Sequence, residues 1–168
     1  MLKYANYDIV FQEIPDEITL AINISNCPNR CEGCHSPYLW KDEGKCLDAE
    51  ELETLVKSYK SSITCVCFMG GDAAPDEVSR LAAQLKQRYQ NLRVGWYSGR
   101  NELPQNVAAT PFDYIKIGRY DARYGPLDSP TTNQRMMKKL ADGRVKDITE
   151  HFRKNKSNNA VNMPRKTM

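Results

Sequence analysis

The residues with the clearest chemical meaning are three cysteines that lie within eight positions of each other. They are Cys27, Cys31 and Cys34, in the spacing C-x₃-C-x₂-C. Cysteine thiolates are the usual protein ligands of iron–sulfur clusters, and four of them normally hold a four-iron cube. Three thiolates in one loop would hold the cube and leave one iron open, as a catalytic metal site keeps one position vacant. The spacing therefore predicts an iron–sulfur enzyme.

Two other uses of these cysteines stay open. A structural zinc ion needs four ligands, but His35 directly follows Cys34 and Cys46 lies twelve residues beyond Cys34. A disulfide framework is typical of short secreted chains, whereas this chain has six cysteines in 168 residues. We find no apolar signal segment and no apolar window long enough for a bilayer, so we expect no membrane partner.

The composition is that of a globular domain with an unusual end. The chain is 40% hydrophobic and 27% charged, which is ordinary, and 168 residues suffice for one core. Residues 153–168 hold five basic residues and no acidic one, so a total charge of +3 leaves residues 1–152 with about −2. A near-neutral body argues against a nucleic-acid binder. We expect one domain over 1–152 and a basic, disordered tail over 153–168.

Hydrophobic periodicity predicts strands that alternate with helices. The expected strands are 17–24, 63–69, 94–97 and 114–118, with further edge strands at 4–11 and 144–149. The expected helices begin at Asp48, which forms a capping box with Glu51, at Pro75, and at Thr131 or Thr132, the last of them ending at Gly143. This order predicts an α/β fold with a mainly parallel sheet and outer helices.

Four loops follow the expected central strands. In order, they carry Cys27–Cys34, Gly70-Gly71-Asp72, Ser98-Gly99 and Gly118-Arg119. Ligands of parallel sheets gather at the carboxyl ends of the strands. We therefore expect these loops to meet at one rim and to form the functional site.

Two further pairs of residues lie on or next to the expected strand 63–69. Gly70 and Gly71 either make a tight turn or let a ligand approach the backbone, with Asp72 beside it. Cys65 and Cys67 share one face of a strand, where we expect them to act as small buried hydrophobes.

Four segments of the chain carry a resemblance to a known family. They are Cys31-Glu32-Gly33-Cys34, Met69-Gly70-Gly71-Asp72, Tyr97-Ser98-Gly99 and Thr132-Asn133-Gln134-Arg135. Together with the C-x₃-C-x₂-C loop, they resemble the radical S-adenosylmethionine superfamily. The short length and the Asn-Gln-Arg segment resemble the activating proteins of anaerobic ribonucleoside-triphosphate reductase within it.

The resemblance implies a small partial (β/α) barrel and a specific set of site residues. Cys27, Cys31 and Cys34 would ligate one [4Fe–4S] cluster, whose open iron would bind S-adenosyl-L-methionine. The residues implied to line this cofactor are Gly33, Cys34, His35, Gly70, Gly71 and Asp72. Reductive cleavage of the cofactor would yield a 5′-deoxyadenosyl radical that takes a hydrogen atom from a glycine of the reductase. No side chain is expected to act as an acid or base, because the cofactor performs the difficult step.

The resemblance also implies partners and a setting. The protein substrate would be the glycyl-radical subunit of the reductase, and the electron donor a flavodoxin or ferredoxin. An oxygen-sensitive cluster implies an anaerobic cytoplasm. The alternatives are a small radical enzyme that acts on a metabolite, and a non-catalytic iron–sulfur or zinc module.

Overall fold

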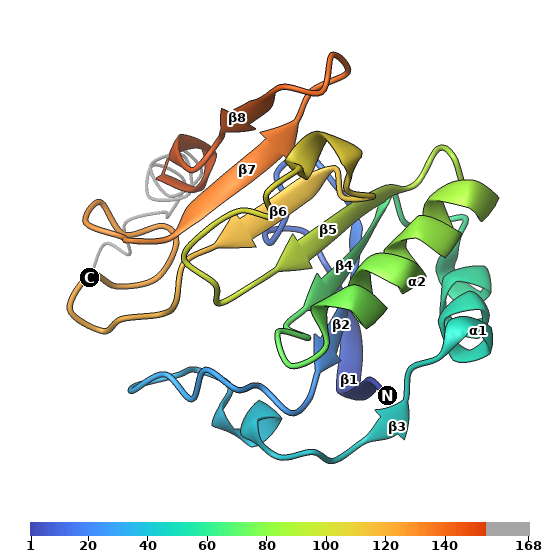
Figure 1. The fold of residues 1–168 in the computed structure, drawn as a ribbon, viewed down its shortest axis with the longest axis horizontal. Helices are drawn as coiled ribbons and strands as arrows, with labels where there is room; N and C mark the ends of the chain where they lie inside the picture. The colour runs from blue at the N-terminus through green and yellow to red at the C-terminus, as the bar shows by residue number, and fades with distance from the viewer. Residues whose placement is uncertain (154–168) are drawn as a thin grey trace, which may run out of the picture.

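Eight strands form one mixed sheet in the computed structural model, which describes residues 1–153 (Figure 1). The strands are β1 (Lys3–Val10), β2 (Thr19–Ile24), β3 (Lys45–Cys46), β4 (Cys65–Met69), β5 (Arg93–Tyr97), β6 (Tyr114–Ile117), β7 (Arg135–Lys139) and β8 (Val145–Asp147). Their order across the sheet is β3-β1-β2-β4-β5-β6-β7-β8. The sheet is open, with β3 and β8 as its edges.

The centre of the sheet is parallel, and this confirms the α/β prediction. Strands β2, β4, β5 and β6 pair in parallel, while β1, β3, β7 and β8 join the sheet in antiparallel pairs. The edge strand expected over 4–11 is β1, which pairs with β2 on one side. On its other side β3 pairs only with Lys3 and Tyr4, so the rest of β1 is an edge. The strand expected over 144–149 is the edge strand β8.

Two α-helices cover one face of the sheet. Helix α1 (Ala49–Tyr59) begins after Asp48, whose side chain accepts a 2.9 Å hydrogen bond from the Glu51 backbone, as the predicted cap requires. Helix α2 (Pro75–Arg88) begins at the predicted proline. Two short 3₁₀ helices, η1 (Pro37–Trp40) and η2 (Val107–Ala109), lie in the connections.

The helix expected over 131–143 is wrong. These residues form β7 and a turn that leads into β8, and β7 pairs with β6. Methionine, lysine and leucine favour helices, but pairing with a strand buried in the sheet overrides that propensity. Burial alternates along residues 132–136, as it does in a strand: Thr132, Gln134 and Met136 are buried, and the two residues between them are exposed.

Each face of the sheet has its own hydrophobic core. The face under α1 and α2 buries Val66, Phe68 and Trp96, whereas the opposite face buries Cys65 and Cys67. The prediction that these two cysteines share a buried face is confirmed. Both thiols are fully buried, and burial raises the pKa of each because the thiolate would lose its solvation.

The structure describes only the first residue of the tail predicted over 153–168. Residues 150–153 are helical, and apart from Arg153 the predicted tail lies outside the described residues. None of the helices within residues 1–153 has the length and apolarity needed to cross a membrane.

Candidate functional site

The four predicted loops meet at the carboxyl ends of the parallel strands. The arrowheads of β5 and β6 point toward this rim in Figure 1, where the cysteine loop and the loop after β6 also lie. Hydrogen bonds join the loops directly. Asn29 of the cysteine loop contacts Asp72 after β4, and Arg119 after β6 contacts Asn29. The parallel topology thus brings together segments that are far apart in the chain.

The cysteine loop holds three free thiols. Cys31 is buried, whereas Cys27 and Cys34 are partly exposed. The backbone N–H of Ser36 donates to Cys34 Sγ at 3.3 Å, and Asn29 Nδ2 lies 3.9 Å from Cys27 Sγ.

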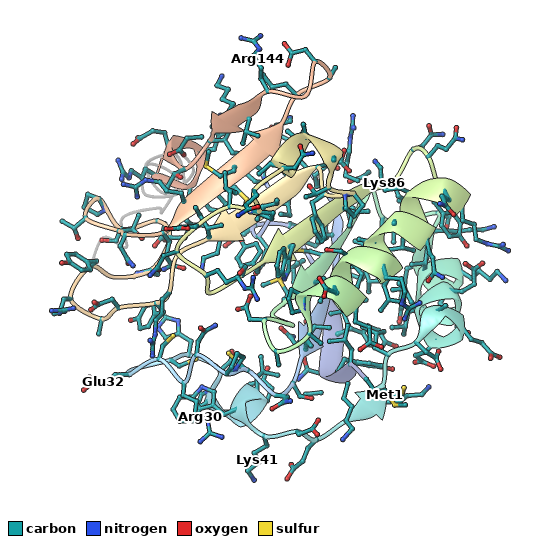
Figure 2. The ribbon with its side chains drawn as sticks, in the orientation of Figure 1. Met1, Arg30, Glu32, Lys41, Lys86 and Arg144 are labelled. Atoms are coloured by element: carbon teal, nitrogen blue, oxygen red, sulfur yellow. The ribbon has the colours of Figure 1, made fainter. Side chains whose placement is uncertain are left out.

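The backbone of the loop is strained at Arg30. Asn26 and Arg30 adopt positive φ angles of 60° and 43°. Asparagine tolerates this region, but an arginine there costs about 1–2 kcal/mol. In Figure 2, Arg30 and Glu32 project outward from the loop. The surrounding contacts must therefore hold the loop in place.

The donor set fits an iron–sulfur cluster better than a single metal ion. Within residues 1–153, no three His, Cys, Asp or Glu side chains converge to hold one ion. Convergence on one point is what a zinc ion requires, whereas a cubane binds each thiolate through a different iron. Three unpaired thiols in one loop, two of them near N–H donors, suit the second arrangement.

Asp72 is the centre of the rim. Its Oδ1 accepts a 2.6 Å bond from Ser98 Oγ, and its Oδ2 accepts bonds from the Gly99 backbone at 2.7 Å and from Asn29 Nδ2 at 2.8 Å. Both carboxylate oxygens are thus engaged by protein groups. The observed role of Asp72 is to fix three loops relative to one another.

The glycine pair makes a turn that only glycine fits. Gly70 and Gly71 have φ angles of 105° and 90°. A Cβ on Gly71 would lie 2.5 Å from Val78 Cγ2, so the turn packs directly against α2. The Gly70 carbonyl accepts a 2.8 Å hydrogen bond from Trp96 Nε1, which engages one of its lone pairs.

Lys116 is a buried cation beside this network. Its Nζ donates to the carbonyls of Gly118 at 2.6 Å and of Ser98 at 3.5 Å. Burial lowers the pKa of Lys116 to about 8, and the negative charges of Asp72, Cys31 and Cys27 oppose that shift. Lys116 therefore places positive charge near the cysteine loop.

A cavity of about 950 Å³ opens beside the last cysteine on the face opposite the helices. It is lined by Cys34, His35, Met69, Tyr97 and Gln134, among others. The volume lies within the range of small-molecule sites, about 300–1,000 Å³. The cavity therefore places a ligand-sized space directly against the cysteine loop.

The loop after β6 packs against this part of the cysteine loop. The rings of His35 and Tyr120 are 5.1 Å apart, and His35 is otherwise exposed. A Cβ on Gly33 would lie 3.6 Å from both Tyr120 and Ala122. His35 and Tyr120 thus line the cavity, while Gly33 packs against Tyr120 without being one of the lining residues.

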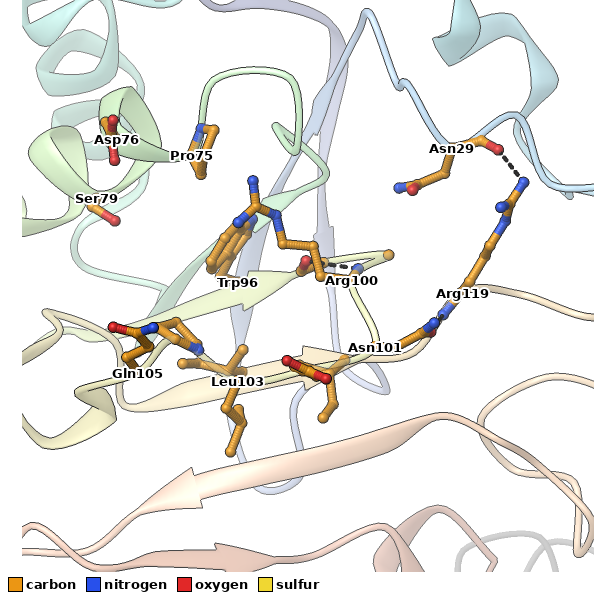
Figure 3. A pocket seen from close by; sticks show the side chains of 16 residues that line it. Asn29, Pro75, Asp76, Ser79, Trp96, Arg100, Asn101, Leu103, Gln105 and Arg119 are labelled. Carbon is orange, nitrogen blue, oxygen red and sulfur yellow. Dashed lines mark hydrogen bonds between the residues drawn. The ribbon is translucent and has the colours of Figure 1, made fainter.

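A second cavity, of about 620 Å³, lies on the helix side of the rim. Figure 3 shows Trp96 and Arg100 within it, with Asn29 and Arg119 at one end and their hydrogen bond dashed. Ser98 and Gly99 also line this cavity. Three hydrogen-bond partners of Asp72, namely Asn29, Ser98 and Gly99, thus line this second cavity.

Sequence reasoning predicted that the rim loops meet, but it did not identify three residues that connect them. Asn29, Arg119 and Tyr120 connect the loops, yet none belongs to a residue class that sequence reasoning assigns to iron–sulfur chemistry. Arg119 was placed at the rim only as part of a loop. Cys46, on β3, and the exposed His151 are not among the rim residues or those that line the two cavities.

Comparison with known families gives one match. The model of the family described as "4Fe-4S single cluster domain" matches residues 18–109, which is more than half of the chain. The matched segment contains the cysteine loop, the Gly70-Gly71-Asp72 turn and Ser98-Gly99. No curated protein and no solved structure matches the chain.

Proposed function

The chain belongs to the family of 4Fe-4S single cluster domains, and from this premise we propose that it is a glycyl-radical activating enzyme of the radical S-adenosylmethionine type. Its substrate would be the glycyl-radical subunit of anaerobic ribonucleoside-triphosphate reductase. The proposal combines the family with the resemblance of the four sequence segments described above.

One observation carries the proposal. A loop with three free thiols follows a parallel strand and borders a cavity of about 950 Å³ on the face of the sheet opposite the helices. Three protein ligands leave one iron of a cubane available to a substrate. Cys27, Cys31 and Cys34 would be those ligands.

The cavity residues would bind and orient S-adenosyl-L-methionine. When bound, a [4Fe–4S] cluster would supply the electron that cleaves this cofactor to methionine and a 5′-deoxyadenosyl radical. Cys34 and His35 line the cavity, and Gly33, which precedes them in the loop, would lie beside the bound cofactor. The backbone of Gly70 and Gly71 would face its amino group, while Asp72 would hold that turn in position.

A protein substrate suits the shape of the site. The sheet does not close, so a loop of another protein has an approach to the cavity that a sealed barrel would deny. The electron donor would be a flavodoxin or ferredoxin, and the setting an anaerobic cytoplasm. We expect no nucleic acid or membrane as a partner.

The decisive experiment is electron paramagnetic resonance under anaerobic conditions. The reconstituted protein is mixed with a candidate reductase, a reductant and S-adenosyl-L-methionine. A glycyl-radical doublet on the reductase is expected, and it should be absent when S-adenosyl-L-methionine is omitted.

Other outcomes would separate the remaining functions. Consumption of S-adenosyl-L-methionine without a glycyl radical would point to a radical enzyme that acts on a metabolite. Colourless protein with one tightly bound zinc ion would overturn the proposal in favour of a non-catalytic module.

A further inference from the structure

We propose that Asn29, between the first two cysteines, is a positioning residue that locks the cysteine loop against the ends of β4, β5 and β6. The inference rests on the proposed function only where it concerns the iron–sulfur cluster. The locking itself is a property of the protein without any cofactor.

The first contact joins Asn29 to β4. Its Nδ2 donates a 2.8 Å hydrogen bond to Asp72 Oδ2, the oxygen that also accepts from the Gly99 backbone. Asp72 is buried and carries a charge, and hydrogen bonds to charged groups are stronger than neutral ones. Loss of the amide would leave this buried carboxylate with one partner fewer.

The second contact joins Asn29 to β5 by shape. A Cβ on Gly99 would lie 2.2 Å from Asn29 Nδ2 and 2.8 Å from Asn29 Cγ. Gly99 does not adopt a positive φ, so its backbone conformation does not by itself demand glycine. The missing side chain at Gly99 is therefore the space that the Asn29 amide occupies.

The third contact joins Asn29 to the end of β6 through the backbone. Arg119 Nη2 donates a 2.5 Å hydrogen bond to the Asn29 carbonyl. The next residue, Arg30, has a φ of 43°, so the loop departs from a relaxed conformation immediately after this contact. Asn29 and its neighbours supply the contacts that hold that conformation.

These contacts set the position of two thiols. Asn29 lies two residues from both Cys27 and Cys31, and its Nδ2 is 3.9 Å from Cys27 Sγ. A shift of Asn29 would move the backbone between them. The contacts of Asn29 would thus fix the positions of the two thiols before a cluster binds. Without these contacts, cluster binding itself would have to order the loop.

The test uses Asn29→Ala, Gly99→Ala and the double variant, with Asn106→Ala as a control. Asn106 is exposed and makes no side-chain cap for η2. Hydrogen exchange of the cluster-free, reduced protein reports on residues 27–36. In Asn29→Ala we expect about tenfold faster exchange there, the factor set by a hydrogen bond to a charged group. Asn106→Ala should match the wild type.

The double variant separates a lock from general damage. Gly99→Ala should loosen the loop, because its methyl group displaces the Asn29 amide. Adding Gly99→Ala to Asn29→Ala should change exchange little further, because the displaced group is already absent. Additive effects of the two substitutions on exchange would overturn the proposal, as would wild-type exchange in Asn29→Ala.

A second readout concerns the reconstituted protein. Asn29→Ala should release iron to a chelator several-fold faster and show a broadened cluster signal in electron paramagnetic resonance. If the wild type takes up no cluster, the proposed function fails while the exchange result stands. If the wild type takes up a cluster and both exchange and iron release are unchanged in Asn29→Ala, the lock is refuted and the proposed function survives.

Discussion

The indole Nε1 of Trp96 donates a 2.8 Å hydrogen bond to the carbonyl of Gly70, and so β5 supports the glycine turn that follows β4. Trp96 is almost fully buried, and its ring stacks on Phe112. The turn is therefore held both by its own conformation and by a side chain from the neighbouring strand.

Replacing Trp96 with phenylalanine removes this hydrogen bond and leaves unfilled volume. We expect a loss of about 2–3 kcal/mol in the free energy of unfolding, measured by urea titration. Trp40→Phe is the matched control, because the buried Trp40 Nε1 has no hydrogen-bond partner within the described residues. That variant should lose less than about 1 kcal/mol. Equal losses in the two variants would show that the Gly70 contact contributes nothing.

The three loop cysteines should differ from the other thiols in their effect on iron. Cys31→Ser removes one proposed ligand, so we expect bound iron and sulfide near background and no cleavage of S-adenosyl-L-methionine. The circular dichroism spectrum should match that of the wild type, which would show that the fold is retained. Cys46→Ser is the control, because Cys46 lies on β3 and outside the loop. Full iron content in Cys31→Ser would be fatal to the proposed ligand set.

The parallel centre and its rim were predictable because their signals are local. Runs such as 63–69 and the glycines after them identify a buried strand and its end without knowledge of the rest of the chain. The strand β7 was not predictable in this way, because helix-forming residues such as Met136 and Met137 become a strand only by pairing with β6.

The links between the rim loops were also beyond sequence reasoning. Asn29 and Asp72 are 43 residues apart, and nothing in their types indicates that they form a hydrogen bond. Asp72 near the cofactor stays a prediction, whereas the hydrogen bonds that its oxygens accept from Ser98, Gly99 and Asn29 were not predicted. Long-range contacts of this kind depend on the packed fold.

The glycine turn gives a prediction about stability. In Gly71→Ala the new Cβ would lie 2.5 Å from Val78 Cγ2, at a φ of 90° that alanine disfavours. We expect a loss of about 2–4 kcal/mol, from strain and overpacking together, measured by urea unfolding. Adding Val78→Ala should recover part of that loss, because it removes the clashing methyl group.

Gly33→Ala is the comparison for this turn. Its φ is 71°, but its nearest contacts would be an ordinary 3.6 Å, so only backbone strain of about 1–2 kcal/mol is expected. A Gly33→Ala variant as unstable as Gly71→Ala would contradict the assignment of the larger effect to the contact with α2.

Lys116 should make the stability of the cluster-free protein depend on pH. Its folded pKa of about 8 lies below its ordinary value of 10.5. Between these values the unfolded chain holds the proton and the folded chain does not, so this group makes stability rise with pH. Below pH 8 the cost of burying the charge is fully present.

Lys116→Met removes this titration. Urea unfolding under reducing conditions should show that the stability of the wild type relative to Lys116→Met increases between pH 8 and pH 10 by an amount on the order of 2 kcal/mol. Taking the difference cancels the titration of groups common to both proteins. A difference that stays constant over this range would mean that Lys116 keeps an ordinary pKa, and hence that water reaches its ammonium group in the folded protein.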